Sequence, residues 1–314
     1  MEKKKQIDCF LPYNTVAMMQ SLATQLYESG VVKNIYTLAA DVLPTEALPQ
    51  YVRQLQTGGL LSLATMRLIA TTATADYALL YLKQGPVTLG YHALERMLQV
   101  AEETGAAMVY ADHYSVEAGK TVKHPVTAYQ LGSIRDDFDF GSVVLLKTEC
   151  LKEYAAREVA KDYQFAGWYD LRLFLSRKGE LFHLNEYLYT EEEDDLRASG
   201  EKQFDYVNPR NREVQIEMEQ AATAHLSAIK ALVDTTQYVQ PDFSGETFPV
   251  EASVVIPVFN REKTVRDAVI SALSQKTDFP FNVIVVDNHS TDGTTEILSS
   301  LAADERLVHL IPTR

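Results

Sequence analysis

The chain has 314 residues, of which 46% are hydrophobic and 23% charged, a composition typical of a globular protein and not of a disordered one. Its 43 acidic residues outnumber its 29 basic residues and give a formal net charge of −14. Such an acidic surface argues against nucleic acid as a partner, because nonspecific binding needs cations that displace phosphate counterions. The length is sufficient for two domains.

The sequence carries no sign of export or of a membrane span. The basic residues 3–5 are followed by Gln6, Ile7 and Asp8 and not by a long apolar segment, so we expect no signal peptide. No run approaches the roughly 18 apolar residues that a transmembrane helix needs. We therefore expect a soluble cytoplasmic protein, and we leave open a peripheral association with the inner face of the membrane.

Apolar spacing predicts alternating strands and helices over the first 190 residues. In chain order these are a strand at 7–13, a helix at 15–29, a strand at 33–38, a helix at 60–74, a strand at 77–82, a helix at 89–103, strands at 107–111 and 140–146, a helix at 169–176 and a strand at 181–184. Gly30 and Gly105 provide stops for two of the helices. This alternation is typical of an α/β domain with a mostly parallel sheet.

A charged and turn-rich stretch separates this region from the rest of the chain. The acidic run 191–195 predicts a solvated loop, because its like charges repel. A long helix is predicted at 210–232, and residues 240–245 form a turn-rich hinge. We therefore expect a first domain at 1–195, a connecting segment at 196–248 and a second domain at 249–314.

The same strand and helix pattern starts again after the hinge. We expect a strand at 252–256, a helix at 265–274, a strand at 282–286, a helix at 294–301 and a strand at 307–311. The first of these strands is an almost continuous apolar run, which predicts that both of its faces are covered.

Two polar clusters follow the first two strands of this second region. Pro257 to Glu262 comes after one apolar strand, and Asp287 to Thr294 comes after the next. Ligands of parallel α/β sheets collect beyond the carboxyl ends of the strands, so both clusters are placed where a ligand would bind. A carboxylate at position 287 could accept a hydrogen bond from a uracil ring N–H or a ribose hydroxyl. Taken alone, residues 287–294 also fit a strand-to-helix turn with a good helix cap.

The two clusters together resemble the start of a family 2 glycosyltransferase, which has the GT-A fold. The matching pattern is Pro-x-Phe-Asn-x-Glu at 257–262, then a helix, then Val-Val-Asp-x-x-Ser-x-Asp-Gly-Thr at 285–294. The resemblance implies that Pro257, Phe259, Asn260, Glu262 and Ser290 lie along the nucleotide of a nucleotide sugar, with a UDP-sugar expected, and that Asp287 contacts the base. It also implies a carbohydrate acceptor and an inverting transfer in surface polysaccharide synthesis.

The family needs two further elements after these motifs. An Asp-x-Asp holds Mg²⁺ or Mn²⁺ against the diphosphate, and a later carboxylate takes the proton from the acceptor. Both would lie beyond Arg314, so we expect a truncated second domain that has no transferase activity by itself.

The first region resembles a weaker copy of the second. Residues 7–14 align with 253–260 if one residue of slip is allowed, which predicts two tandem GT-A-like domains. Where the copy should carry Asp-x-Asp it has Tyr81 and Lys83, which cannot hold a hard cation. Two alternatives remain open: Lys83 replaces the metal by pairing with a diphosphate, or the copy is a non-catalytic pseudo-transferase.

Other candidate residues in the first region carry weaker signals. At the expected position of the base the chain has Trp168, which leaves Asp170 as a catalytic candidate two residues further on. Asp112 and His113 follow a predicted strand and could be a pair of metal ligands, although solvated residues at a strand end explain them equally well. The rivals to a transferase are a non-catalytic pseudo-glycosyltransferase that binds an acceptor or partner, and a nucleotidyltransferase, which would need a glycine-rich phosphate loop that is absent here.

Overall fold

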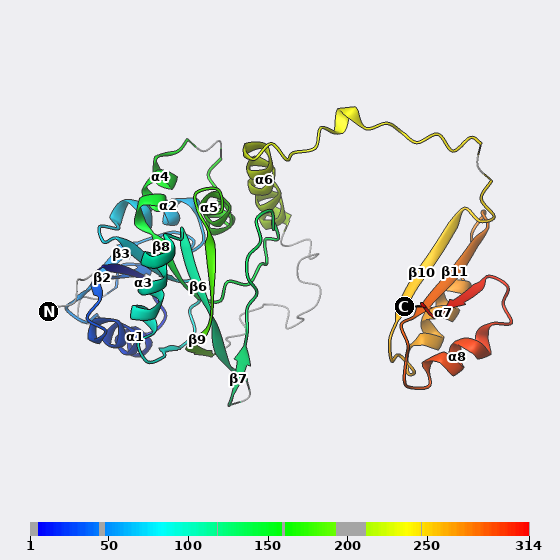
Figure 1. Ribbon diagram of the computed structural model, residues 1–314, viewed down its shortest axis with the longest axis horizontal. Helices are drawn as coiled ribbons and strands as arrows, with labels where there is room; N and C mark the ends of the chain where they lie inside the picture. Colours follow the sequence, from blue (N-terminus) through cyan, green and yellow to red (C-terminus); the bar gives the residue numbers. More distant parts are fainter. Residues whose placement is uncertain are drawn as a thin grey trace. The chain divides into compact units, whose positions relative to one another are not determined.

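The structure is a computed structural model that describes residues 6–43, 48–117, 119–158, 161–192, 212–245 and 247–313. The chain divides into two compact units, Met1–Val233 and Asp234–Arg314, and most of their helices and strands are labelled in Figure 1. The predictions for the acidic run beyond Glu192 and for the start of the long helix lie outside the described residues.

The described part of the first unit contains a nine-stranded sheet with the order β3-β2-β1-β4-β8-β6-β9-β5, and β7 pairs with β6. The strands are β1 (Ile7–Pro12), β2 (Val32–Ala39), β3 (Val52–Gln56), β4 (Tyr77–Tyr81), β5 (Val87–Leu89), β6 (Met108–Glu117), β7 (Lys120–His124), β8 (Val143–Lys147) and β9 (Leu181–Glu192). The half from β3 to β4 is parallel. Beyond it β8 runs antiparallel to both β4 and β6, while β6 and β9 are parallel.

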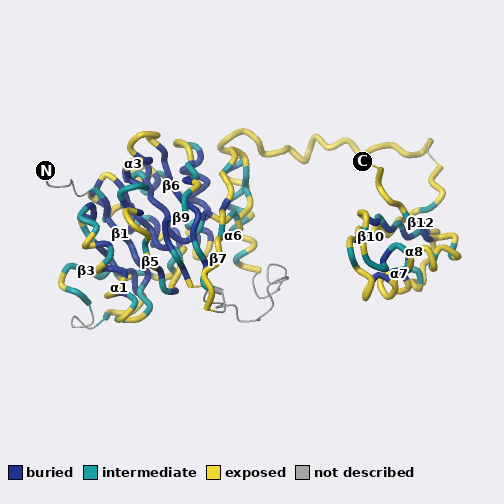
Figure 2. The backbone as a smooth tube through the Cα atoms, turned by 60° about the horizontal axis from the view of Figure 1, so that its bottom comes forward, coloured by how far each residue is buried: buried dark blue, intermediate teal, exposed yellow. Residues whose placement is uncertain are grey.

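Helices cover both faces of this sheet (Figures 1 and 2). On one face pack α1 (Val16–Glu28) and α3 (Ala93–Thr104), and on the other α2 (Leu63–Thr72), α4 (Thr148–Ala156), α5 (Gly167–Leu175) and α6 (Arg212–Ala228). Strand β1 shows why two layers form. Its Cys9 and Leu11 enter one core and its Phe10 enters the other, because successive side chains of a strand point to opposite faces. A strand that is apolar on both sides therefore needs helices on both sides.

A buried carboxylate of α6 binds this helix to the rest of the first unit. Glu217 accepts hydrogen bonds from the backbone N–H groups of Gln164, Phe165 and Ala166, at 3.1, 2.7 and 3.1 Å. These groups directly precede α5, where a negative charge also meets the positive end of the helix dipole. Glu217 thus satisfies N–H groups that have no partner within α5.

The second unit is a three-stranded parallel sheet in the order β10-β11-β12. Its elements are β10 (Ala252–Val258), α7 (Val265–Leu273), β11 (Phe281–Asp287), α8 (Thr294–Leu301) and β12 (Leu307–Leu310). Both helices pack on one face, against Val258, Val283 and Val285. On the opposite face Val255 is 59% exposed and Leu310 47% exposed. The prediction that β10 is covered on both faces is therefore wrong for this unit, because α7 and α8 share one side.

The structure confirms the predicted α/β class and most of the predicted elements. Among the described strands and α-helices, four were not predicted, namely β3, β5, β7 and α4, and β9 continues eight residues beyond its predicted end at Leu184. Both units open with a parallel strand–helix–strand, formed by β1, α1 and β2 in the first and by β10, α7 and β11 in the second. Within the described residues we find no helix with the length and apolar character of a membrane span.

Candidate functional site

The two polar clusters of the second unit meet at the carboxyl edge of its sheet. Strands β10 and β11 are parallel, and Val258 is opposite Asp287, so the turns that follow them begin side by side. The backbone N–H of Asn260 donates to Ser290 Oγ at 3.0 Å. In return, Asn260 Oδ1 accepts from the backbone N–H of Thr291 at 2.7 Å. We call residues 257–262 and 287–294 together the nucleotide shelf, after the ligand that the sequence leads us to expect there.

Further hydrogen bonds tie the two halves of the nucleotide shelf to each other. The backbone N–H of Arg261 donates to Thr294 Oγ1 at 2.8 Å, and that of Glu262 donates to Asp292 Oδ2 at 3.1 Å. Asn260 has a φ of 51°, a left-handed conformation that asparagine tolerates better than most residues. The shelf is therefore one hydrogen-bonded structure and not two independent loops.

Asp287 is the structural centre of the shelf. Its side chain is buried, and its two oxygens accept hydrogen bonds from the backbone N–H of Ser290 at 2.9 Å and from Thr295 Oγ1 at 2.6 Å. Burial by itself raises the pKa of this carboxyl, but the hydrogen bonds from Ser290 and Thr295 outweigh burial and lower the pKa overall. Asp287 is thus held ionised, and it fixes the turn that leads into α8.

The outer side of the shelf is formed by the other predicted residues. Pro257 and Glu262 are exposed, and the Phe259 ring is 52% exposed. Beside Asp287, Asn288 and His289 are also exposed. A flat apolar ring next to amide and carboxylate groups can contact a planar base and accept hydrogen bonds from ribose hydroxyls.

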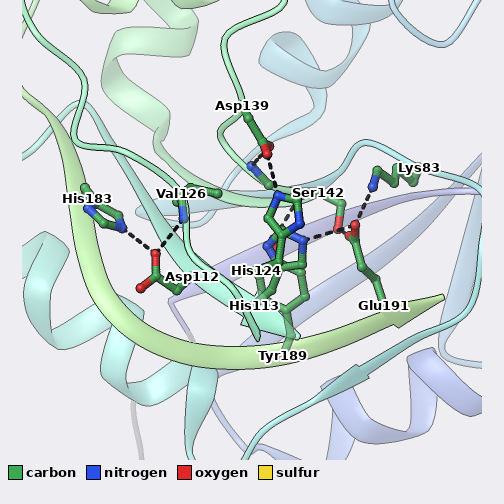
Figure 3. Close-up of polar contacts among 11 residues, drawn as sticks. Lys83, Asp112, His113, His124, Val126, Asp139, Ser142, His183, Tyr189 and Glu191 are labelled. Atoms are coloured by element: carbon green, nitrogen blue, oxygen red, sulfur yellow. Dashed lines mark hydrogen bonds and ion pairs between the residues drawn. The ribbon is translucent and has the colours of Figure 1, made fainter. Parts of the chain in front are cut away.

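At the carboxyl end of β4 in the first unit, an internal ion pair replaces the expected Asp-x-Asp. Lys83 Nζ binds the carboxylate of Glu191, which is 2% exposed and comes from the far end of β9 (Figure 3). Ser142 Oγ donates to the same carboxylate, and His113 Nε2 lies 3.2 Å from it. Burial raises the pKa of Glu191, but the hydrogen bonds from His113, Lys83 and Ser142 lower it to about 2. The prediction that Glu191 belongs to a solvated loop is therefore wrong, because its carboxylate is buried as the ion-pair partner of Lys83 and is also bound by His113 and Ser142.

Tyr189 closes this network beside Gly141. The Tyr189 hydroxyl accepts from the backbone N–H of Ser142 at 2.9 Å, and its ring stacks on His113 at 5.0 Å. Gly141 has a φ of 68°, and a Cβ atom there would lie 2.1 Å from the Tyr189 hydroxyl. This position therefore requires glycine both for its backbone conformation and for space.

Asp112 and His113, the candidate metal pair, contact different partners. Asp112 Oδ1 accepts from His183 Nε2 at 2.7 Å and from the backbone N–H of Val126 at 2.9 Å (Figure 3). His113 faces Glu191 instead, and both side chains are almost fully buried. Across the described ranges, no three His, Cys, Asp or Glu side chains gather as a metal site.

Asp170, the candidate base, lies on α5 beside the buried Tyr154 and the partly buried Arg157. Tyr154 Oη donates to its carboxylate at 2.9 Å, and the guanidinium of Arg157 forms an ion pair with it. The side chain is only 7% exposed. This arrangement joins α4 and α5, and it leaves the carboxylate little room to approach an acceptor hydroxyl.

Sequence reasoning did not find Ser142 and Tyr189 as members of the network, and it gave His183 no role. Their partners lie 47 to 71 residues away along the chain. The one local signal was the Asp-Phe-Gly-Ser stretch at 139–142, which marks a tight turn before a strand.

Comparison with known proteins bears mainly on the nucleotide shelf. Residues 253–314 match the model of the glycosyl transferase family 2. Over 59 residues the chain is 41% identical to an uncharacterized glycosyltransferase, YfnE, of Bacillus subtilis (strain 168). This match spans 19% of the chain and 15% of YfnE, so the chain corresponds to a small part of that relative.

The chain also matches solved structures of the S. aureus protein TarS (residues 1–349). One form matches with a TM-score of 0.47 at 12% identity, covering 74% of this chain and 67% of that one. The complex of TarS with UDP-GlcNAc gives 0.44 at 11% identity, over 78% and 76% of the two chains. The complex with UDP gives 0.49 at 11% identity, over 74% and 68%.

Proposed function

We propose that the chain is part of a family 2 glycosyltransferase that moves a sugar from a nucleotide-diphosphate donor to a carbohydrate acceptor in surface polysaccharide synthesis. The observation that carries the proposal is the coincidence of the family match with the nucleotide shelf. The matched residues 253–314 include both turns, and these turns are hydrogen-bonded at the edge where α/β sheets bind ligands. We take the donor to be a UDP-sugar, the ligand class that TarS holds in one of its solved complexes.

Within this proposal the shelf residues divide into two roles. Pro257, Phe259 and Glu262 are exposed and would lie along the base and ribose. Asn260, Ser290 and Asp287 would act mainly by holding the two turns together, since their polar atoms bond across or within the shelf. The predicted contact of Asp287 with the base then requires that the base approach the edge of a buried carboxylate.

The proposed reaction is a single displacement. A carboxylate takes the proton from an acceptor hydroxyl, the oxygen attacks the anomeric carbon, and the nucleotide diphosphate leaves from the opposite side. In the complete enzyme Mg²⁺ or Mn²⁺ would neutralise the leaving diphosphate. Asp112 and His113 do not fit that ion, because they bond to different partners, and we assign no step of the reaction to them.

One observation favours a non-catalytic role for the first unit. The charge of Lys83 is already neutralised by Glu191, whose low pKa keeps it ionised throughout the neutral range. A diphosphate would have to compete with this internal partner. We therefore propose that the first unit is a pseudo-transferase unit that contributes binding rather than chemistry.

Calorimetric titration of UDP tests the nucleotide shelf. We expect residues 1–314 to bind UDP and an Asp287→Ala variant to bind it much more weakly, with and without Mn²⁺. Asp278→Ala is the matched control, because Asp278 is an exposed carboxylate ahead of β11, at the other end of that strand. Equal binding by the wild type and Asp287→Ala would remove Asp287 from the site.

We also expect no sugar transfer by residues 1–314 alone. Measured turnover of a nucleotide sugar by these residues would overturn this expectation.

A further inference from the structure

A seam on the first unit carries two neighbouring cavities that the proposed reaction does not use. Helix α1 lies along β5 there (Figure 2). One cavity of about 270 Å³ is lined by Met18 and Ser21 of α1 and by Thr88 of β5. The other, of about 470 Å³, is lined by Glu28 of α1 and by Tyr91 just after β5. We call this feature the α1 seam.

The two cavities are aligned along one side of α1. Met18, Ser21, Gln25 and Glu28 are spaced three or four residues apart and so form a single stripe on the helix. In the lining of the second cavity, Gln25 Oε1 accepts a hydrogen bond from the backbone N–H of Leu89 at 2.9 Å. From Met18 to Glu28 the helix rises about 15 Å, so the seam suits an elongated ligand better than a single small ring.

The lining of the seam selects against anionic ligands. Neither cavity is lined by a lysine or an arginine in the described part of the chain. Glu28 and Glu95 line the second cavity, and the imidazole of His92 is already paired with Glu95 at 2.8 Å. A phosphate or carboxylate ligand would therefore meet negative charge without a compensating cation. Side chains such as Ser21 and Glu28 instead suit a ligand rich in hydroxyl groups.

The end of the seam presents an aromatic ring on a constrained backbone. Tyr91 is 92% exposed, which is unusual for a large aromatic side chain. The residue before it, Gly90, lies so close to β9 that a Cβ atom would be 2.8 Å from the carbonyl oxygen of Leu188. The residue after it, His92, has a left-handed φ of 52°. Such strain at a surface residue is typical of a functional position.

We propose that the α1 seam binds an uncharged oligosaccharide. One sugar ring stacks its C–H face on Tyr91, and the following rings extend along α1 toward Ser21, with their hydroxyls bonded to Glu28 and to the polar groups of the first cavity. The site belongs to the first unit alone. It does not depend on the nucleotide shelf, so each can fail without the other.

The test is a calorimetric titration of residues 1–314 with three uncharged tetrasaccharides, chitotetraose, cellotetraose and maltotetraose. We expect at least one of them to bind, and Tyr91→Ala to bind it about tenfold more weakly, a loss of about 1.4 kcal/mol. Ser21→Trp, which places a large side chain in the first cavity, is expected to weaken the same sugar. Tyr238→Ala is the matched control, since Tyr238 is 69% exposed and lies outside the seam.

Two results would overturn the proposal. One is the failure of all three tetrasaccharides to bind, and the other is binding that neither Tyr91→Ala nor Ser21→Trp weakens. Unchanged thermal unfolding of the variants shows that a loss of binding is local. UDP titrated against the same variants should bind as it does to the wild type, which separates this site from the nucleotide shelf.

Discussion

The side-chain oxygen of Asn260 accepts a hydrogen bond from the backbone N–H of Thr291, 31 residues further along the chain, at 2.7 Å. This bond joins the turn after β10 to the turn after β11, and the reciprocal bond from the Asn260 N–H to Ser290 Oγ completes the junction. A ligand on this edge therefore meets a surface whose two halves cannot move apart without breaking both bonds.

Two substitutions of Asn260 should weaken this junction to different degrees. Asn260→Gly removes the side-chain bond but keeps the left-handed backbone accessible, at a cost of about 1 kcal/mol. Asn260→Ala removes the same bond and adds the cost of a left-handed conformation, about 1–2 kcal/mol more. Thermal unfolding and UDP titration should rank the proteins in the order wild type, Asn260→Gly, Asn260→Ala. If the alanine variant equalled the glycine variant, the backbone conformation would not contribute.

The buried carboxylate of Glu191 should make stability depend on pH in the acid range. Its pKa is about 2 in the folded protein, against an ordinary value of 4.5. A carboxyl whose pKa is lowered on folding stabilises the protein above the ordinary value, and this contribution is lost as pH falls from about 4.5 to about 2. We expect it to amount to at most about 3.4 kcal/mol. Urea unfolding of wild type and Glu191→Gln between pH 2 and pH 7 measures it.

The Glu191→Gln variant is the control for the urea unfolding experiment. Glu191→Gln cannot ionise, so its free energy of unfolding should fall less on acidification than that of the wild type. Parallel pH profiles for the two proteins would show that Lys83 and His113 do not hold the carboxylate in the manner described.

Gly141→Ala should be more harmful than other glycine substitutions at positive φ. At Gly141 the new methyl group meets the hydroxyl of Tyr189, whereas at Gly105, with a φ of 66°, nothing lies within 4 Å. Gly105→Ala therefore reports the cost of backbone conformation alone, about 1–2 kcal/mol, and Gly141→Ala adds a clash of about 1–3 kcal/mol. Chemical unfolding of both variants gives the difference. Equal losses would mean that Tyr189 can move aside.

Glu217 should be essential for the attachment of α6. Glu217→Ala leaves three backbone N–H groups before α5 without their acceptor and should cost about 2–3 kcal/mol. Glu219→Ala is the matched control, because Glu219 is exposed on the same helix. Hydrogen exchange of α6 should increase in the first variant and stay unchanged in the second.

The elements found from the sequence are those with a strong local pattern. β1, β4 and β10 are mostly apolar segments of five to seven residues, and α1 and α3 have clear helical spacing. The missed elements lack such signals. β5 has only three residues, and β7, which pairs with β6, contains charged residues. α4 begins after Lys147 without a side chain that caps its first turn. Their structure is set by neighbouring strands and helices and not by their own residues.

The candidate site was predicted to a similar degree. The pairing of the two shelf turns follows from parallel strands, which bring their carboxyl ends to one edge. The placement of Glu191 did not follow, because a local run of like charges predicts solvent exposure. Its partners Lys83 and Ser142 lie 108 and 49 residues away, and only the folded sheet brings them together.

The narrow space at Gly141 has an evolutionary consequence. A chain that retains the tyrosine hydroxyl of position 189 against this turn has no space for a side chain at position 141, whereas a chain that replaces Tyr189 by a smaller residue loses this steric restriction and keeps only the cost of the positive φ. Across homologous sequences the two positions should therefore covary, and glycine at one should accompany tyrosine at the other even though β8 and most of β9 separate them along the chain.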